Sequence, residues 1–302
     1  MDKKSLENIA AKLRLDTLIA INKAGSGHAG SCMSCMDILV ALYYGAVNGV
    51  SHSRNGLNDG AKNASRPCVV MKFNPNKPRW DERDYFVLSK GHAVPALYAV
   101  LAEQGFFDKS EMKYLRQIGG LLQGYPNVKV PGIEASVGSV GQGVSIAVGL
   151  AMAIKADREN RNVFVLAGDG ELQEGQCWEA IMAAAHFKLD NLVLIIDQNK
   201  LQLDGACGAV MNVAPLADKF EAFGWKVIPV VSGHDIEELV YAFEKAKNVA
   251  RQPVVILAPT IEGKGVPFAE NKPAYHGVPF SDAEMEEVMK KFGEVEEVGE
   301  VT

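Results

Sequence analysis

Apolar and polar residues follow two different periods along this chain. Residues 3–24 and 33–45 carry apolar side chains at i, i+3 and i+4, which predicts two amphipathic helices. Five short runs are instead continuously apolar, as is typical of strands that are buried on both faces of a sheet. These predicted strands are YFVL (85–88), NVFVLA (162–167), NLVLIID (191–197), WKVIPVV (225–231) and PVVILAPT (253–260).

Segments with a helical pattern separate the five predicted strands. Strands that alternate with helices form a parallel sheet with helices on both faces, so we predict a doubly wound α/β fold for one domain at residues 1–280. Residues 281–302 predict a last helix with an acidic, solvated tail. The Gly- and Asn-rich stretch 51–68 shows neither period and is predicted to be a surface loop insertion.

Composition and charge argue against several classes of partner. The chain has 302 residues, of which 48% are hydrophobic, and a net charge of −6. A negative chain does not attract nucleic-acid phosphates, and the sequence has no run of about 18 apolar residues to span a membrane. The N-terminus lacks the basic-then-apolar order of a secretory signal, so we expect a soluble, cytoplasmic protein.

The cysteines favour reduced thiols. Five cysteines are scattered along the chain without the spacing of a disulfide framework. Cys32 and Cys35 form a CxxC pair, but no second pair at a useful spacing completes a zinc site. On a predicted helix, these two are better explained as small packing residues.

Polar residues follow two successive predicted strands. Asp169 comes directly after one strand, in AGDGELQEG, and Asn199 comes after the next. Either residue alone is compatible with a turn or a helix cap. Because ligands bind beyond the carboxyl ends of parallel strands, the pair can converge on one point. A carboxylate, an amide oxygen and a backbone carbonyl suit Mg²⁺ or Ca²⁺, and the flanking Gly168 and Gly170 let a diphosphate approach the backbone.

The GDG segment at 168–170, followed by Asn199, resembles the signature of thiamine-diphosphate enzymes. Further segments resemble motifs of the transketolase family, in that family's order. They are GSGHAGS (25–31), LSKGHAVPALYAVL (88–101), PGIEASVGSVGQGVSIAVGLAMA (131–153), GDGELQEGQCWEA (168–180), IIDQNKLQLDG (195–205) and GKGVPFAENKPAYHG (263–277). The resemblance spans roughly residues 10–280 and implies the diphosphate-binding domain of a transketolase.

The resemblance implies a set of binding residues. Asp169 and Asn199 would ligate the metal together with the carbonyl of Leu201. The implied cofactor-binding residues are His28, Ser31, His92, Gly138, Ser139, Val140, Gly168, Asp169, Gly170, Glu174, Asn199 and His276. Glu174 matches a family glutamate that lies between cofactor sites at a subunit interface, although a charge at a helix N-terminus explains it equally well.

Three of the six histidines match the pocket histidines of the family and are predicted to be catalytic. Imidazoles suit a reaction in which sugar hydroxyls and a carbonyl exchange protons near neutral pH. These three are His28, His92 and His276. The remaining His52, His186 and His234 match no family motif and are predicted to be structural.

Tyr125 departs from the family pattern. The segment LLQGYPN places Tyr125 where a donor-facing histidine is expected and Asn127 where a glutamate is expected, and Val137 stands where a threonine is common. A phenol with a pKa of about 10 donates a hydrogen bond but does not titrate near neutral pH. His28, Tyr125 and His276 are predicted to bind the sugar. The change at Tyr125 either leaves the choice of substrate almost unchanged or favours a modified or branched ketose as the donor.

In the transketolase family, a second domain binds the pyrimidine ring and supplies the glutamate that activates the cofactor. The resemblance covers only the first domain, so it implies the N-terminal subunit of a split transketolase, with a C-terminal partner subunit in an α2β2 heterotetramer. This enzyme would transfer a two-carbon ketol unit from a ketose or ketose phosphate to an aldose. Two alternatives are the alpha subunit of a 2-oxoacid dehydrogenase, which shares the GDG signature, and a catalytically silent diphosphate-binding protein. The histidines of SKGH and YHG favour transketolase.

Overall fold

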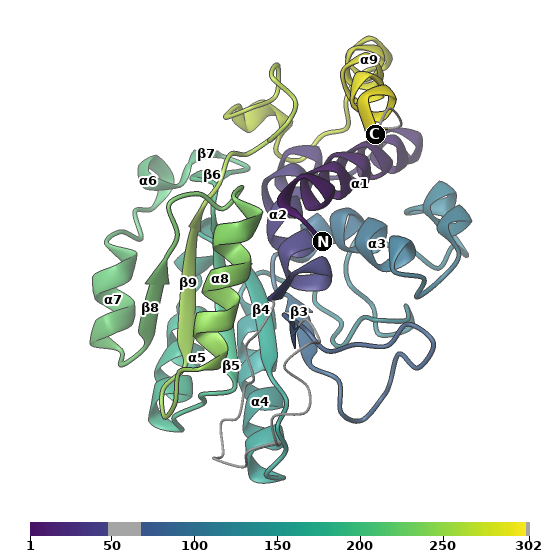
Figure 1. Cartoon of the computed structure of the whole chain (residues 1–302). Helices are drawn as coiled ribbons and strands as arrows, with labels where there is room; N and C mark the ends of the chain where they lie inside the picture. Colours follow the sequence, from purple (N-terminus) through teal and green to yellow (C-terminus); the bar gives the residue numbers. More distant parts are fainter. Residues whose placement is uncertain (48–67, 300–302) are drawn as a thin grey trace.

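A computed structural model describes residues 1–47 and 68–299, and the five predicted strands form one parallel sheet within it (Figure 1). All strand pairs of this sheet are parallel. In spatial order the strands are β3 (Tyr85–Leu88), β4 (Val163–Gly168), β5 (Leu192–Gln198), β9 (Val254–Pro259) and β8 (Lys226–Pro229). Each strand therefore lies where an apolar run predicts it: β3 has the predicted bounds, and the ends of the other four differ by one or two residues.

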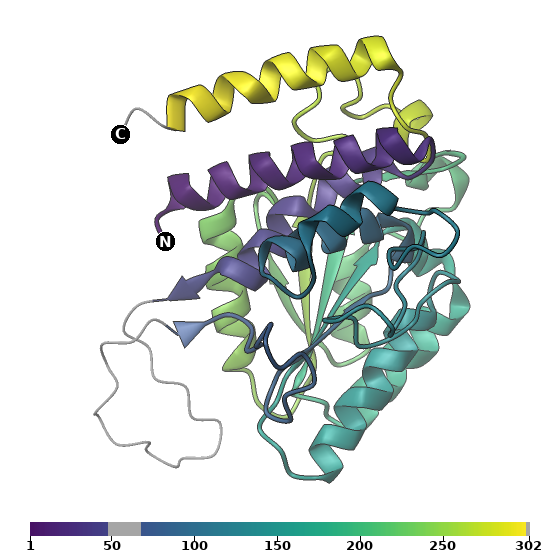
Figure 2. The same ribbon diagram turned by 90° about the vertical axis from the view of Figure 1, so that its right-hand side faces the viewer.

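Helices cover both faces of this sheet (Figures 1 and 2). One face carries α1 (Lys3–Ala24), α2 (Ala29–Tyr44), α3 (Val94–Glu103) and α8 (Ile236–Lys247). The other carries α4 (Gln142–Ala156), α5 (Gly175–His186) and α7 (Leu216–Ala222). Successive residues of a strand point to opposite faces, so Phe164 packs in the first core and Val165 in the second. The prediction of a doubly wound α/β fold is confirmed.

The first two helices follow the predicted pattern, with one difference. Helix α1 has the predicted bounds, but α2 begins at Ala29 rather than at residue 33. The glycines of GSGHAGS are typical of a loop, yet Ala29 and Gly30 are buried here and continue the helix. His28 is thus the residue before the first turn of α2, and Ser31 lies within that turn.

The described residues cover only part of two predicted segments. Residues 51–67 of the predicted surface loop lie outside the described residues, and its last residue begins β2 (Cys68–Val69), which pairs with β1 (Ala46–Val47). The C-terminal segment contains α9 (Asp282–Gly299), which lies alongside α1 (Figure 2). The domain boundary at residue 280 remains a prediction.

Short elements connect the layers. They are the 3-10 helices η1 (Gly91–Ala93), η2 (Lys109–Tyr114), η3 (Gly170–Gln173) and η4 (Pro273–Tyr275), the hairpin strands β6 (Leu201–Gln202) and β7 (Gly205–Ala206), and α6 (Cys207–Val210). None of the helices in the described ranges is both long and apolar enough to cross a bilayer.

The carboxyl ends of the parallel strands gather the polar residues at one edge of the sheet. Gly168 at the end of β4 is in register with Asp197 near the end of β5, so Asp169 and Asn199 emerge side by side. Strand β3 ends just before Ser89, and β9 ends just before Thr260. This edge is where a doubly wound sheet binds its ligands.

Candidate active site

A pocket of about 280 Å³ lies at the carboxyl edge of the sheet. Its lining comes from the start of α2, the turn after β3, the loop around residue 125, the segment before α4, the segment after β4, the β6–β7 hairpin and the segment near η4. The predicted site residues that line it are His28, Ser31, His92, Tyr125, Val140, Gly168, Asp169, Gly170, Glu174, Asn199, Leu201 and His276. Gly138 and Ser139 are exposed and do not line this pocket. Their predicted contact with the cofactor therefore stays a prediction.

Asp169 is a buried carboxylate at the end of β4. Its Oδ1 accepts a hydrogen bond from the Gly170 amide at 2.9 Å, and its Oδ2 accepts one from the Lys200 amide at 2.8 Å. Burial, reinforced by the negative charge of Asp197, raises the pKa of Asp169 to about 6. A bound cation would relieve this penalty, because it favours the charged form of the carboxylate.

The side-chain amide of Asn199 has a fixed orientation. The Leu201 amide donates to Asn199 Oδ1 at 3.0 Å, while Asn199 Nδ2 donates to Glu262 at 2.6 Å. Asn199, Asp169 and Leu201 line the same pocket. One carboxylate, one amide oxygen and one backbone carbonyl form a hard-oxygen set, which fits Mg²⁺ or Ca²⁺ in the presence of a diphosphate.

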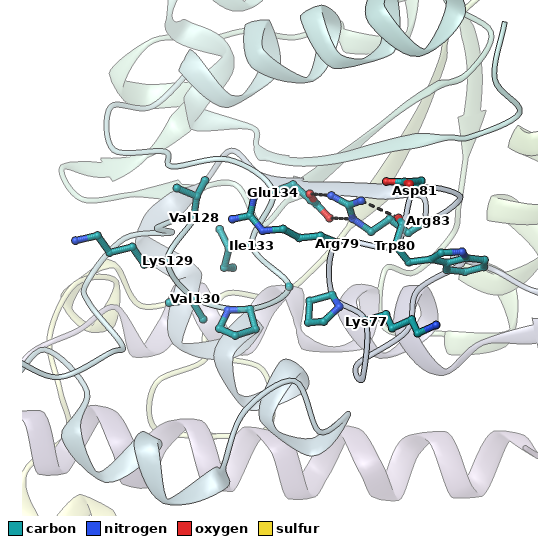
Figure 3. A pocket seen from close by; sticks show the side chains of 13 residues that line it. Lys77, Arg79, Trp80, Asp81, Arg83, Val128, Lys129, Val130, Ile133 and Glu134 are labelled. Carbon is teal, nitrogen blue, oxygen red and sulfur yellow. Dashed lines mark hydrogen bonds and ion pairs between the residues drawn. The ribbon is translucent and has the colours of Figure 1, made fainter. Parts of the chain in front are cut away.

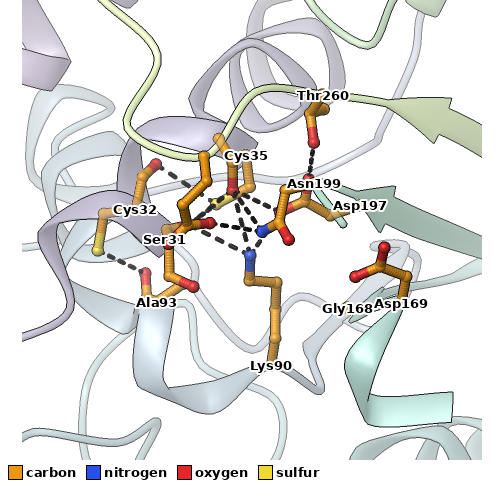
Figure 4. A network of polar contacts seen from close by, with 12 residues as sticks. Ser31, Cys32, Cys35, Lys90, Ala93, Gly168, Asp169, Asp197, Asn199 and Thr260 are labelled. Carbon is orange, nitrogen blue, oxygen red and sulfur yellow. Dashed lines mark hydrogen bonds and ion pairs between the residues drawn. The ribbon is translucent and has the colours of Figure 1, made fainter. Parts of the chain in front are cut away.

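An ion pair that we did not predict from the sequence lies close to Asn199 (Figure 4). The Lys90 ammonium contacts the Asp197 carboxylate, and both side chains are buried. Ser34 donates to Asp197 at 2.6 Å, and the Thr260 hydroxyl donates to its other oxygen. Although burial alone lowers the pKa of Lys90, the attraction of Asp197 and its neighbours raises it overall. A sequence signal existed, since Asp197 is a charged residue at the end of an apolar run.

Glu171 connects three segments of the site through hydrogen bonds. Its buried carboxylate accepts hydrogen bonds from the Ser89 hydroxyl at 2.5 Å, the Gly141 amide at 2.6 Å and the Gly168 amide at 3.1 Å. Burial raises the pKa of Glu171. These contacts hold the turn after β3, the end of β4 and the start of α4 in one arrangement.

The three predicted catalytic histidines form a cluster. The ring centroids lie 4.9 Å apart for His28 and His92, 5.8 Å for His28 and His276, and 5.5 Å for His92 and His276. The Ser31 hydroxyl lies 2.9 Å from His92 Nε2. Burial, followed by the positive charge of neighbouring groups, lowers the pKa of His28 to about 4 and that of His92 well below its ordinary value. Both rings are therefore neutral near pH 7, and each has one nitrogen that can accept a hydrogen bond.

Tyr125 lies at the mouth of this pocket, with 42% of its surface exposed. The Tyr98 hydroxyl donates to the Tyr125 carbonyl at 3.1 Å, which anchors its backbone. A Cβ at Gly91 would come within 3.1 Å of the Tyr125 ring, so the ring packs tightly on the turn that carries His92. The phenol is therefore available to a ligand that enters beside the histidines.

Glu174 occupies the residue before α5 and lines the pocket while remaining exposed. Its side chain makes no capping hydrogen bond to the helix. Its position is thus compatible both with a charge near the α5 N-terminus and with a contact outside this chain.

Of the residues predicted to be structural, those that the structure describes do not line the pocket. Cys32 and Cys35 are buried in α2, where their thiols donate to the carbonyls of Ala93 and Ser31 (Figure 4). His234 lies outside the pocket and contacts Asp37. His186 is exposed at the end of α5, and His52 lies outside the described residues.

A second hollow, of about 670 Å³, lies between segments 77–83 and 128–134 (Figure 3). Its central charged groups are already paired, because Arg83 makes two contacts of 2.7 Å with Glu134. None of the predicted site residues lines it. The smaller pocket at the sheet edge is therefore the candidate active site.

Comparison with known proteins places this pocket in a family context. The family model described as transketolase, thiamine diphosphate binding domain, matches residues 64–299. The chain is 36% identical to one of the subunits of the apulose-4-phosphate transketolase of Phocaeicola vulgatus, over 97% of this chain and 96% of that protein. It is 38% identical to a 6-deoxy-6-sulfo-D-fructose transketolase subunit of Clostridium sp., over 92% of each.

Larger relatives match over only part of their length. Human transketolase is 37% identical over 95% of this chain, and the match spans 42% of the human protein. The crystal structure of transketolase from Campylobacter jejuni superposes with a TM-score of 0.84 at 32% identity, covering 97% of this chain and 43% of that one.

Proposed function

Because this chain belongs to the transketolase family, whose thiamine-diphosphate-binding domain it matches, we propose that it is the diphosphate-binding subunit of a two-chain transketolase. With its partner, it transfers a two-carbon ketol unit from a ketose to an aldose. The observation that carries this proposal is the single pocket that holds Asp169, Asn199 and the histidine cluster. All the relatives described above are named transketolases, which favours this activity over that of a 2-oxoacid dehydrogenase.

The chain's own residues divide into a metal-binding and a sugar-binding half. Asp169, Asn199 and the Leu201 carbonyl would hold Mg²⁺ or Ca²⁺, which would neutralise the charge of a bound diphosphate. Thiamine diphosphate, when bound, supplies the electron sink for cleavage of a carbon–carbon bond. His28 and His92 line the same pocket, and we expect their neutral rings to accept hydrogen bonds from the sugar hydroxyls.

The remaining half of the site comes from a partner chain. The match spans only 42% of human transketolase, and both bacterial relatives are named as subunits. The partner supplies the pyrimidine-binding domain and its activating glutamate, in an α2β2 assembly. We expect Glu174, which is exposed and lines the pocket, to contact the neighbouring chain.

The donor sugar is a modified or branched ketose rather than the usual pentulose phosphate. The two bacterial relatives are named for apulose 4-phosphate and 6-deoxy-6-sulfo-D-fructose. Tyr125 lines the pocket and packs on the turn that carries His92, so we expect its phenol to contact the bound sugar. A site built around one hydroxyl loses much of its binding energy when that hydroxyl is moved, so this position can redirect substrate choice.

We expect the purified chain to be inactive alone and to gain ketol-transfer activity on mixing with its partner, which we would seek in the adjacent reading frame. The reason is that the pyrimidine-binding half and the activating glutamate are supplied by the partner. Coupled enzyme assays with thiamine diphosphate, Mg²⁺ and a panel of ketoses measure the gain. Robust ketol transfer by the isolated 302-residue chain would refute the two-chain proposal.

Isothermal titration of the mixed subunits with thiamine diphosphate and Mg²⁺ tests the catalytically silent alternative. Heat of binding together with turnover supports the enzyme. Failure to bind the cofactor would leave a silent scaffolding protein as the better description.

Tyr125→His tests the choice of donor. We expect the reconstituted wild type to be fastest on a modified ketose, and the variant to shift toward xylulose 5-phosphate, because imidazole is shorter than phenol and titrates near neutral pH. The measurement is kcat/KM on each sugar for both enzymes. If the wild type already prefers xylulose 5-phosphate and the variant ranks the sugars in the same order, Tyr125 does not set specificity.

A further inference from the structure

Glu262 is a fully buried carboxylate that touches both halves of the active site. It lies in the segment after β9 and has an exposed fraction of 0%. Its Oε2 accepts a hydrogen bond from Asn199 Nδ2 at 2.6 Å, and its Oε1 lies 2.9 Å from His276 Nδ1. Among the described residues, neither Glu262 Oε1 nor His276 Nδ1 makes a hydrogen bond of normal geometry. Their approach to 2.9 Å is therefore an electrostatic contact between two buried polar atoms.

The backbone around Glu262 is held in place on both sides. The Ile261 amide donates to His234 Nε2 at 2.8 Å, and the Asn271 amide donates to the Glu262 carbonyl at 2.9 Å. His234 is in turn held by Asp37 at 2.7 Å. The scaffold thus determines where the Glu262 carboxylate lies.

The start of α2 leaves room for this carboxylate. A Cβ on Gly30 would lie 2.5 Å from Glu262 Oε1, closer than real side-chain carbons come. The helix N-terminus also carries a partial positive charge, which favours a carboxylate close to it. A glycine at this position is therefore what allows a buried acid to reach between the metal-binding and sugar-binding halves.

The carboxylate fixes the amide orientation of Asn199. A deprotonated carboxylate only accepts hydrogen bonds, so it faces the amide nitrogen of Asn199 and not its oxygen. The Leu201 amide, which only donates, faces the oxygen at 3.0 Å. The two contacts together turn Asn199 Oδ1 away from Glu262, in the orientation that a metal ligand requires.

The same carboxylate fixes the tautomer of His276. A carboxylate oxygen and an unprotonated ring nitrogen 2.9 Å apart would repel each other, so the ring nitrogen that faces Glu262 carries the proton. In the neutral ring this leaves Nε2 without a proton and free to accept one. His276 lies in the histidine cluster, 5.5 Å from His92 between ring centroids.

We propose that Glu262 is the positioning residue that aligns Asn199 for the metal and sets His276 as a proton acceptor toward the sugar. One side chain thereby links the cofactor half of the site to the substrate half. This inference rests on the proposed transketolase function for its catalytic meaning, while the two contacts are properties of the chain itself.

The test is Glu262→Gln, which keeps the shape of the side chain but offers one acceptor and one donor. It can satisfy Asn199 or His276 in the present arrangement, but not both. We expect either the proton of His276 to move to Nε2 or the Asn199 amide to turn over. Ring ¹⁵N shifts of the full chain at neutral pH, without ligand, report the first outcome. Calorimetry of the reconstituted complex with Mg²⁺ and thiamine diphosphate reports the second, as an affinity about 10- to 100-fold lower.

Glu270→Gln is the matched control, because Glu270 lies in the same segment and accepts from the Gly265 amide at 2.9 Å, outside the pocket. It should change neither readout. The proposal is overturned if wild-type His276 carries its proton on Nε2, or if Glu262→Gln changes neither the ¹⁵N shifts nor the affinity. Because the shifts are measured without substrate or partner, they test the contacts even if the reconstituted wild type lacks transketolase activity, a result that would reject only the proposed function.

Discussion

Replacing Asp169 by alanine is expected to abolish the Mg²⁺-dependent binding of thiamine diphosphate in the reconstituted enzyme. The substitution removes the only carboxylate of the proposed ligand set and leaves the diphosphate charge uncompensated. The fold should persist, because Gly170 lines the pocket and Lys200 is exposed, so the amides that Asp169 accepts from can bond to water instead. Calorimetry with Mg²⁺ and thiamine diphosphate measures the loss, and circular dichroism checks the fold.

Two further variants test whether the loss of cofactor binding is due to the charge of Asp169. Asp169→Asn keeps the volume and an acceptor oxygen but removes the charge, so it separates electrostatic from steric loss. Asp204→Ala removes an exposed carboxylate from the nearby hairpin and should bind the cofactor normally. Full turnover of the Asp169→Ala complex at saturating Mg²⁺ would show that the metal assignment is wrong.

Replacing Lys90 by methionine is expected to lower the free energy of unfolding of the full chain by about 3–5 kcal/mol, the usual cost of breaking a buried ion pair. The relative exposure is 1% for the Lys90 side chain and 0% for that of Asp197, so the variant leaves a buried carboxylate without its cation. Urea titration of the purified chain gives the free energy of unfolding.

The exposed pair of Lys155 and Asp190 provides the control. Their side chains are 39% and 26% exposed, and Lys155→Met should cost about 0–1 kcal/mol. The double variant Lys90→Met/Asp197→Asn should recover part of the stability lost in Lys90→Met, because it removes the unpaired charge. A loss for Lys90→Met no greater than that of the exposed control would mean that the buried pair contributes little to stability.

The sequence by itself determined the elements and the edge of the sheet at which the site forms. Apolar periodicity is a local property, so α1 and the five strands could be predicted from short windows. Parallel strands bring their carboxyl ends to one edge, which is why Asp169 and Asn199 could be expected to converge. The motif order added the three histidines, whose rings do cluster.

Tertiary structure alone decided which polar groups lie close to these residues and between them. Lys90 and Asp197 are 107 residues apart in sequence, and Asn199 and Glu262 are 63 apart. Neither pair can be recognised from the periodicity of the sequence. A buried charge is stabilised by whichever opposite charge or hydrogen-bond donor the folded chain brings close to it. The position of Gly138 and Ser139 outside the pocket, and the early start of α2 that places Ser31 in a helix, likewise follow from packing around the site rather than from local pattern.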